Sequence, residues 1–546
     1  MQQTPVLRFW NLLKLYRTEL RQIYAYAIFN GIVNLSLPLG IQAIINFLQT
    51  GEMTSSWVLL VIFVLFGIAL TGIIQVYQLR IVENIQQDIF ARSAVEFAYR
   101  IPRIKILQLD KIHAPELVNR FFDTLTIQKG LPKILIDFSL ASFQIVFGLI
   151  LLAIYSPFFI ILGLSLFLIL GIIFRITGRR GLNTSLKESK FKYNLAHWLE
   201  EVARTNKSFK VNAYNELHLD KTDDITSKYL NAREKHFGVL LDQFRYFIGF
   251  KVFVAAGLLL LGGFLVFREQ MNIGQFVAAE IIIILIINSV EKVIRVIETI
   301  YDVLTALEKI GYVTDLDLDA DTGQLSLQAK GPLKVEVHNL VFGFPNMKTR
   351  LFDDFSMKIP PGSKAVICGT PGTGKSTLLQ LISGVQKPEE GEIVVNNIPI
   401  DNYSRKEFYN KIGMSFSTND LFEGTIKENI LMGRDVADEK LQEVINLLGL
   451  NEYVARQPGG VNCSIDSGGR RLPRSLIQKL LVARTIIGEP GLLLMEDPLQ
   501  FVSDAEKNKI IDYVMSPERD WTVIVVADYY YWREKSTLLV ELEKTN

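Results

Sequence analysis

The sequence predicts a helical membrane domain of six spans, followed by an α/β domain that carries a phosphate-binding loop. Hydrophobic residues make up 49% of the chain, and most of the excess lies before residue 310, which is typical of membrane proteins. The second observation is the stretch GTPGTGKST, Gly369–Thr377, which follows an apolar run at 364–368 and leads into a helical pattern. At 546 residues the chain is too long for one compact core, so separate domains are expected.

Charge and cysteine content exclude two classes of protein. The 58 Lys and Arg residues nearly balance the 57 Asp and Glu residues, so nothing indicates a nucleic-acid partner. The two cysteines, Cys368 and Cys463, lie far apart in the second domain, and no disulfide framework is predicted.

The N-terminal half is predicted to hold an interfacial helix and six membrane spans. Pro5–Leu20 alternates apolar and basic residues and favours an amphipathic helix in the membrane interface, with an ordinary surface helix as the alternative. Six later segments are close to the ~20 residues that cross a bilayer. They are Ile23–Leu48, Trp57–Val76, Ile134–Tyr155, Phe158–Phe174, Phe247–Val266 and Ile273–Ile287.

Loop charges predict the orientation of these spans. The long loops after the second and fourth spans are rich in Lys and Arg, whereas the three opposite loops carry only Arg268. The positive-inside rule therefore places the long loops and both termini in the cytoplasm. Helical patterns continue through the long loops, so we expect the spans to extend beyond the membrane and to end in short turns near Leu107–Pro115 and Phe209–Leu219.

Two carboxylates lie in apolar surroundings. Glu280 in the last span is a candidate for a substrate path or, alternatively, simply faces a wet cavity, and Asp137 near the cytoplasmic end of the third span is expected to be solvated. The predicted division is an interfacial helix at 1–20, a membrane domain at 21–313, an acidic linker at 314–331 and a nucleotide-binding domain at 332–546.

The phosphate-binding loop has the chemistry of a nucleoside triphosphate site. Its glycines let successive N–H groups point inward, Lys375 can reach the terminal phosphates, and the Ser376 hydroxyl can ligate Mg²⁺. The residues predicted to hold the nucleotide are Gly369, Thr370, Pro371, Gly372, Thr373, Gly374, Lys375, Ser376 and Thr377.

Six spans with long helical cytoplasmic loops, an acidic linker and a phosphate-loop domain resemble a half-transporter of the ATP-binding cassette (ABC) exporter family, over essentially the whole chain. The segments Met271–Glu280 and Arg100–Phe121 are more similar to the type I secretion branch than to the drug-export branch. LFEGTIKENI, Leu421–Ile430, also matches the family closely. The resemblance implies ATP and Mg²⁺ as cofactors, and a six-helix exporter-type domain joined to an ABC-type ATP-binding domain.

The resemblance also assigns roles to single residues. Phe344, in the stretch Val341–Pro345, would stack on adenine, with a core phenylalanine as the alternative. The family's Mg²⁺-binding glutamine falls at Ser417, and no glutamine occurs between Lys387 and Leu441. That contact is therefore expected to be missing.

The family's signature motif, LSGGQ, is replaced here. Ser467–Arg470 (SGGR) looks similar, but the spacing to Ala483–Arg484 selects Leu472–Leu476, LPRSL, in which side chains replace both glycines. Arg474 could then meet a phosphate electrostatically, obstruct close approach, or be a plain surface arginine. The sequence leaves these possibilities open.

Three further positions depart from the family. The strand LLLME ends in Glu496–Asp497, where the family has Asp followed by Glu, so Glu496 stands at the metal position and Asp497 at the position of the catalytic base. A misplaced base can cost about 10²-fold in rate. Asp528 stands where a histidine should meet the γ-phosphate, and a carboxylate there would repel phosphate.

The predicted function is an ABC exporter-like half-transporter that dimerises, binds ATP and exports an unknown substrate, with hydrolysis weak or absent. The alternatives are a slow working exporter and a nucleotide-gated membrane scaffold or regulator of a separate secretion system. The implied partners are a second half-transporter, identical or different, membrane lipid and a periplasmic adaptor. We expect an integral protein of the cell or inner membrane.

Overall fold

The computed structural model describes residues 3–50, 55–109, 112, 114–212, 216–319, 323–327, 331–344, 349–417 and 420–543. The chain divides into two compact units. The first runs to Asp317, apart from residues 105–107, and the second comprises these three residues and 318–546. The predicted turns near 107–115 and 209–219, the linker and the stretch ending at Pro345 lie partly outside the described residues.

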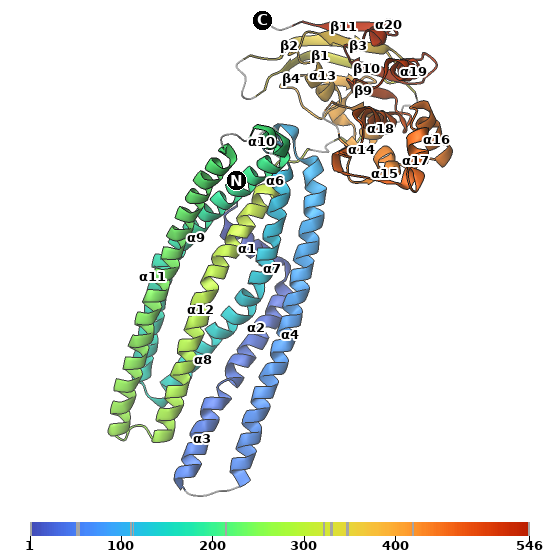
Figure 1. The fold of residues 1–546 in the computed structure, drawn as a ribbon. Helices are drawn as coiled ribbons and strands as arrows, with labels where there is room; N and C mark the ends of the chain where they lie inside the picture. Colours follow the sequence, from blue (N-terminus) through green and yellow to red (C-terminus); the bar gives the residue numbers. More distant parts are fainter. Residues whose placement is uncertain are drawn as a thin grey trace. The chain divides into compact units, whose positions relative to one another are not determined.

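The first unit is a bundle of long helices (Figure 1). Six helical segments are long and apolar enough to cross a membrane, which confirms the predicted six-span architecture. The helices are α2 (Arg17–Val33) with α3 (Ser36–Thr50), α4 (Ser55–Arg100), α7 (Asp123–Pro132) with α8 (Ser139–Tyr155), α9 (Phe158–Arg204), α11 (Leu217–Phe267) and α12 (Ile273–Thr314). Four of them exceed 40 residues, far more than a bilayer needs, as the helical patterns of the loops predict.

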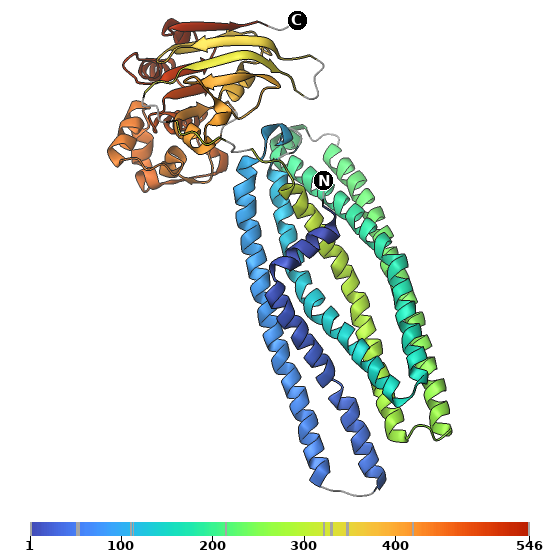
Figure 2. The same ribbon diagram turned by 180° about the vertical axis from the view of Figure 1, so that it is seen from behind.

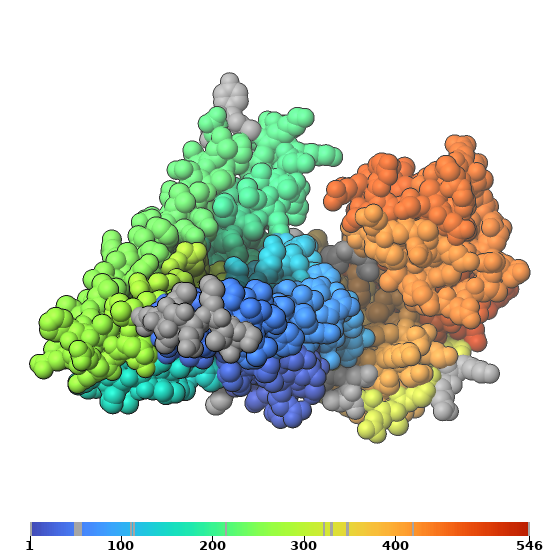
Figure 3. Space-filling view, turned by 90° about the horizontal axis from the view of Figure 1, so that it is seen from below, coloured from blue at the N-terminus to red at the C-terminus, as the bar shows by residue number. Residues whose placement is uncertain are grey.

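The ends of the bundle differ. The connections α8–α9 and α11–α12 lie at one end, where α3 ends and α4 begins, and the short helices α6 (Ala114–Asn119) and α10 (Asn206–Asn212) lie at the other (Figure 1). Figure 3 looks onto the first of these ends, where α3 and α4 in blue neighbour α12 in yellow-green. Isoleucine and valine side chains of α12 line the apolar core against α8, α9 and α11.

The first span is not one continuous helix. Pro38 lacks an N–H, and its ring conflicts with the carbonyl four residues earlier, at Asn34. The helix accordingly breaks at Asn34–Leu35, between α2 and α3. Helix α1 (Pro5–Leu15), which the sequence predicts to lie in the membrane interface, is also shorter than the amphipathic pattern suggested. Tyr16 leaves the helical region (φ −112°, ψ 35°), and α2 starts in a new direction.

A π-helix, Lys133–Phe138, interrupts the third span directly after Pro132. It carries Asp137, which is exposed and has Lys133 and Lys292 as charged neighbours. Glu280 is exposed on α12. Neither acid is therefore packed among the apolar side chains of its own chain, and the structure leaves both interpretations of Glu280 open.

The second unit combines two main sheets with a helical part (Figure 1). An antiparallel sheet has the order β2-β1-β4-β5, and a parallel sheet has the order β11-β3-β10-β9-β6. The antiparallel strands are β1 (Val335–Phe342), β2 (Phe352–Ile359), β4 (Glu390–Val395) and β5 (Ile398–Pro399). The parallel strands are β3 (Lys364–Gly369), β6 (Ile412–Ser415), β9 (Leu492–Glu496), β10 (Thr522–Val526) and β11 (Leu538–Leu542). Helix α13 (Lys375–Ile382) packs between the sheets, with Leu378, Leu379, Leu381 and Ile382 fully buried.

The helical part follows β6. It contains α15 (Ile426–Leu431), α16 (Asp438–Leu447), α17 (Asn451–Arg456) and α18 (Arg474–Ile486). Helix α15 begins with a capping box between Thr425 and Glu428, which explains why the LFEGTIKENI stretch changes from loop to helix at this point. The apolar core of this helical part is continuous with the face of the parallel sheet opposite α13.

Candidate nucleotide-binding site

The topology of the parallel sheet brings the predicted site residues together. Strands β3, β10, β9 and β6 are neighbours in this order and run in the same direction. Their carboxyl ends therefore meet at one edge, where ligands bind in open α/β sheets. The phosphate loop follows β3, Asp528 follows β10, Glu496 and Asp497 end β9, and Ser417 follows β6.

The phosphate loop has a backbone that only glycine adopts without strain. Gly372 and Gly374 have φ values of 88° and 90°, and Gly374 immediately precedes α13. A Cβ on Gly374 would lie 2.8 Å from Phe352 Cζ and 2.9 Å from Leu351 Cδ2, whereas a Cβ on Gly372 would meet nothing within 4 Å. The loop is thus tightly packed on one side and open where a phosphate would approach.

Lys375 is folded over this loop. Its Nζ donates hydrogen bonds to the carbonyl oxygens of Gly369 (2.5 Å) and Thr370 (3.3 Å). These are contacts within the loop itself, so an incoming phosphate would compete with two neutral carbonyls for the ammonium group. A charged acceptor makes the stronger bond, which favours transfer of Lys375 to the phosphate.

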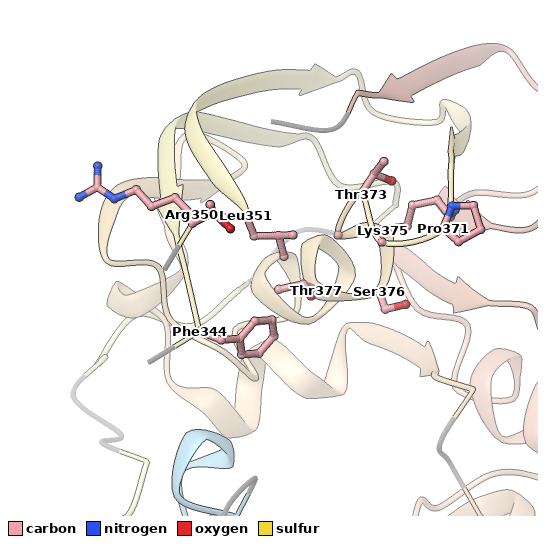
Figure 4. Close-up of a pocket in the computed structure, with 11 residues that line it drawn as sticks. Phe344, Arg350, Leu351, Pro371, Thr373, Lys375, Ser376 and Thr377 are labelled. Carbon is pink, nitrogen blue, oxygen red and sulfur yellow. The ribbon is translucent and has the colours of Figure 1, made fainter. Parts of the chain in front are cut away.

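A cavity of about 500 Å³ opens beside the loop (Figure 4). Phe344 lies at its edge, next to α13, and its ring meets Phe342 edge-on at 5.2 Å. Phe344 is only partly buried, so one part of the ring packs on the core and another lines the cavity. The position of Phe344 is thus compatible with both interpretations, stacking on adenine and packing in the core.

Residues 349–351 also line this cavity and were not predicted. Arg350 points away from the loop in Figure 4, and its guanidinium pairs with Asp353 at 3.2 Å and more distantly with Glu389. Leu351 packs at the loop glycines. No local pattern marks this segment, because it reaches the cavity only through the pairing of β1 with β2.

Glu496 joins two parts of the site. One of its carboxylate oxygens accepts a hydrogen bond from Ser376 Oγ, and the other accepts one from the backbone N–H of Ser417 (3.1 Å). The residue at the metal position is therefore directly beside the hydroxyl predicted to ligate Mg²⁺. Among the described residues, no group of three or more His, Cys, Asp or Glu side chains could hold a metal ion by itself.

These donors fit Mg²⁺ bound together with a nucleotide. Mg²⁺ typically takes one or two protein oxygens and completes its shell with phosphate and water. Ser376 and Glu496 would supply the protein oxygens, and the open side of the phosphate loop would receive the phosphates. Bound ATP would supply a labile γ-phosphate and a charge that Lys375 can pair with.

The other two acids create an unfavourable environment for that phosphate. Burial raises the pKa of the Asp497 carboxyl above its usual range, and the negative charges of Asp528 and Glu496 raise it further, against the opposing influence of Lys375. Asp497 also holds a strained backbone, with φ at 40°. Asp528 and Glu496 thus place negative charge near Asp497, and a phosphate bound in the site would add to it.

A second, smaller cavity of about 250 Å³ lies between the end of β9 and the start of α18. Gln478 crosses it, donating to the Asp497 carbonyl (3.3 Å) and accepting from the Phe501 N–H (2.7 Å). Arg474, the first residue of α18, stacks its guanidinium on the Phe501 ring at 4.9 Å. Neither Phe501 nor Gln478 was predicted, since their roles depend on contacts between separate segments.

The structure separates the two candidate signature segments. LPRSL lies at the start of α18, where helix N–H groups are available to an anion. The SGG stretch forms a short 3₁₀ turn, Ser467–Gly469, and the Gly468 N–H already donates to the Leu421 carbonyl (2.7 Å). Only the first segment has the placement that the family's motif requires.

Comparison with known proteins identifies the family. The sequence model of the ABC transporter transmembrane region matches residues 23–290, and that of the ABC transporter ATP-binding domain matches residues 352–500. The chain belongs to the ABC transporter family. Its domain composition is that of an exporter half-transporter, with one membrane domain and one ATP-binding domain.

Relatives in this family are distant. A putative export ATP-binding/permease protein of Rickettsia bellii is 21% identical over 473 residues, covering 86% of this chain and 82% of that protein. A similarly named protein of Rickettsia conorii is 28% identical, over 44% of this chain and 42% of its own length. An ATP-dependent lipid A-core flippase of Xylella fastidiosa is 26% identical, over 50% of this chain and 46% of its own. Two of these three alignments thus span less than half of the relative.

The fold of a bacterial Atm1-family ABC exporter solved with ATP bound is similar throughout. It superposes with a TM-score of 0.85, covering 97% of this chain and 94% of that one, at 16% sequence identity. This likeness confirms the predicted fold class. The type I secretion branch and the loss of catalytic residues remain predictions.

Proposed function

We propose that this chain is an ABC exporter half-transporter that pairs with a second half-transporter, binds ATP with Mg²⁺ and couples binding to the export of a substrate, with weak or absent hydrolysis. The observation that carries the proposal is the contrast at one sheet edge. Glu496 is bonded to Ser376 in an intact phosphate site, whereas the shorter Asp497 stands at the position of the catalytic base and the carboxylate of Asp528 at that of the switch histidine.

Nucleotide binding is supported by groups that contact the nucleotide without taking part in hydrolysis. The open side of Gly372 and the ammonium group of Lys375 would hold the phosphates, and the cavity beside Phe344 would hold the base. Ser376 and Glu496 would supply protein oxygens to Mg²⁺. The sequence-based domain division, with 332–546 as the ATP-binding domain, is retained in this proposal.

Weak hydrolysis is supported by the length and the charge of the acids. Asp497 is one methylene shorter than the family's glutamate, so its carboxylate would lie farther from the attacking water, and such a misplacement can cost about 10²-fold in rate. Asp528 would repel the γ-phosphate, and Ser417 offers a backbone N–H to Glu496 but no long amide side chain to the metal. Each change acts on the hydrolytic step more than on binding.

A second chain would not restore full activity. A partner with an ordinary signature motif would complete the phosphate site of this chain, but Ser417, Asp497 and Asp528 would still belong to it. The partner's own nucleotide would meet LPRSL. We therefore propose a transporter-like membrane protein whose ATP-binding domain lies in the cytoplasm. Its two half-transporters are identical or different, and its nucleotide sites close on ATP but hydrolyse it slowly. A periplasmic adaptor is part of the same proposal.

The carboxylates also favour a second candidate, a nucleotide-gated scaffold or regulator of a separate secretion system. Such a protein would need closure on ATP but no hydrolysis. The two candidates share the binding site and differ in turnover.

Measuring ATP affinity and turnover on the purified chain tests the proposal. We expect ATP binding that Lys375→Ala weakens strongly, and turnover below ~1 s⁻¹, a usual lower figure for enzymes. Faster turnover that Lys375→Ala abolishes would contradict weak hydrolysis, and absence of ATP binding would contradict the whole proposal.

A triple variant provides the matched comparison. Glu496→Asp, Asp497→Glu and Asp528→His together restore the family's order of acids and its histidine. If the three positions limit hydrolysis, this variant gains turnover with little change in ATP affinity. Unchanged turnover would contradict the assignment of weak hydrolysis to these three positions.

A further inference from the structure

A cavity of about 300 Å³ lies under the interfacial helix α1, in the first unit of the chain. It is apolar except for hydroxyl groups and the tip of Trp10. Its lining comes from α1, α2, the π-helix, α8 and α12, and includes Trp10, Leu13, Tyr24, Leu135, Phe138 and Ser142. Helix α1 runs obliquely across the long helices (Figure 2). Its residues Trp10 and Leu13 form one wall of the cavity.

The level of this cavity in the membrane follows from an ion pair. Arg8 of α1 donates to Asp315 directly after α12 and lies 3.6 Å from Glu308, with its guanidinium packed on Gly311. Helix α12 leads into the ATP-binding domain, which is cytoplasmic in this family. Helix α1 and the start of α2 therefore lie toward the cytoplasmic end of the bundle, and the amphipathic pattern of α1 favours the membrane boundary there.

The exposed face of α2 changes from charged to apolar at the cavity. Arg17, Arg21, Tyr24 and Ile28 are spaced by four, three and four residues, so they share one face of the helix, and all four are exposed. Within the described part of the chain, Arg17 and Arg21 make no ion pair or side-chain hydrogen bond. Two uncompensated cations thus precede the tyrosine that lines the cavity.

We propose that this cavity binds one acyl chain of an anionic phospholipid from the cytoplasmic leaflet, whose phosphate is held by Arg17 and Arg21. An apolar cavity at the edge of the hydrocarbon region is unfavourable for water, and the lipid provides the apolar group available there. Anionic headgroups in that leaflet attract basic residues near the surface. Filling the cavity would support α1 from below and so maintain the Arg8 contact with the end of α12.

The preference for an anionic over a zwitterionic headgroup can be estimated from the two arginines. Each basic residue near the membrane surface contributes about a fivefold preference for anionic lipid. Arg17 and Arg21 together give about a 25-fold preference over a zwitterionic lipid with the same acyl chains.

Photo-crosslinking tests this proposal on the full chain. The protein is reconstituted in vesicles of equal parts phosphatidylglycerol and phosphatidylcholine, with a diazirine on the acyl chain of either lipid. We expect phosphatidylglycerol to label the segment 133–143 about 25-fold more than phosphatidylcholine does. Arg17→Gln should reduce this preference about fivefold, and Arg17→Gln with Arg21→Gln should remove it.

A second variant blocks the cavity itself. The Ser142 hydroxyl bonds only to the Phe138 carbonyl of its own helix (2.7 Å), so Ser142→Phe fills space without breaking a contact between helices. It should reduce labelling by both lipids. The matched controls Arg80→Gln and Ala69→Phe alter exposed residues of α4 outside the cavity and should change neither result.

Three outcomes would overturn the proposal. Equal labelling of the unaltered chain by both lipids would exclude headgroup selection by Arg17 and Arg21. Undiminished labelling of Ser142→Phe would place the acyl chain elsewhere on the surface. Absence of labelling by either lipid would assign the cavity to contacts with the second chain.

Discussion

Glu496 is the residue whose replacement best tests the nucleotide site. The change Glu496→Gln keeps the shape of the side chain and removes its charge. In the structure the two carboxylate oxygens accept from Ser376 Oγ and the Ser417 N–H. A glutamine can keep both contacts, because its oxygen can accept from Ser417 and its amide N–H can donate to Ser376.

The magnitude follows from these two bonds. Hydrogen bonds to a charged group contribute about 1.5–3 kcal/mol and those between neutral groups about 0.5–1.5 kcal/mol, so the variant loses about 1 kcal/mol per bond and about 2 kcal/mol in all. Folded domains are typically stable by about 5–15 kcal/mol, so this loss is substantial but smaller than the total, and the fold should persist. The larger effect concerns Mg²⁺, which loses the only carboxylate bonded to Ser376. We expect Mg²⁺ affinity to fall by about 10- to 100-fold or more.

ATP binding with and without Mg²⁺ measures this effect. Titration of the wild-type chain should show tighter ATP binding when Mg²⁺ is present, and Glu496→Gln should show little of this gain. Glu518→Gln, a change at an exposed residue of the same domain, serves as the matched control. If Mg²⁺ strengthens ATP binding equally in all three proteins, Glu496 is not the metal ligand and the assignment is wrong.

Three other predictions follow from the second unit. Gly374→Ala should abolish ATP binding, measured by equilibrium titration, because its φ of 90° and a Cβ 2.8 Å from Phe352 leave no room for the side chain. Wild-type binding by this variant would contradict the loop geometry. Arg474→Ala should weaken ATP-dependent association of the ATP-binding domains, measured by double electron–electron resonance, if the arginine meets a phosphate; stronger association would instead show obstruction. Burial lowers the pKa of Lys364 from 10.5 in the unfolded chain to about 8 in the folded chain. Below pH 8 the lysine is protonated in both states, and its burial destabilises the folded state most in that range. The free energy of unfolding should therefore rise by up to about 3 kcal/mol between pH 8 and 10.5, and Lys364→Met should lack this rise in a comparison of denaturant midpoints.

The fold was largely predictable because its signals are local. A span is recognised by some twenty consecutive apolar residues, and the phosphate loop by glycines at fixed spacing next to Lys375. Both patterns persist whatever the rest of the chain does. The break at Asn34–Leu35 could also have been derived from Pro38, since proline acts on the carbonyl four residues earlier.

The π-helix and the second cavity were not predictable in the same way. The π-helix Lys133–Phe138 adds a residue to a helical turn, and its sequence still reads as an ordinary apolar span. Gln478 and Phe501 are 23 residues apart in sequence and meet only because α18 packs at the end of β9. Contacts of this kind depend on the tertiary fold, whereas the sequence pattern reports only secondary structure.

The position of Arg474 narrows the choice that the sequence left open. Its guanidinium stacks on Phe501, which at an exposed site contributes about 0.5–1 kcal/mol. A hydrogen bond from arginine to a phosphate contributes about 1.5–3 kcal/mol. Arg474 can thus leave Phe501 for a phosphate with a net gain, and the same flexibility lets it move away from an approaching partner. The replacement of a signature glycine by arginine is therefore compatible with closure on ATP, and we expect Asp497 and Asp528 to limit turnover more than Arg474 does.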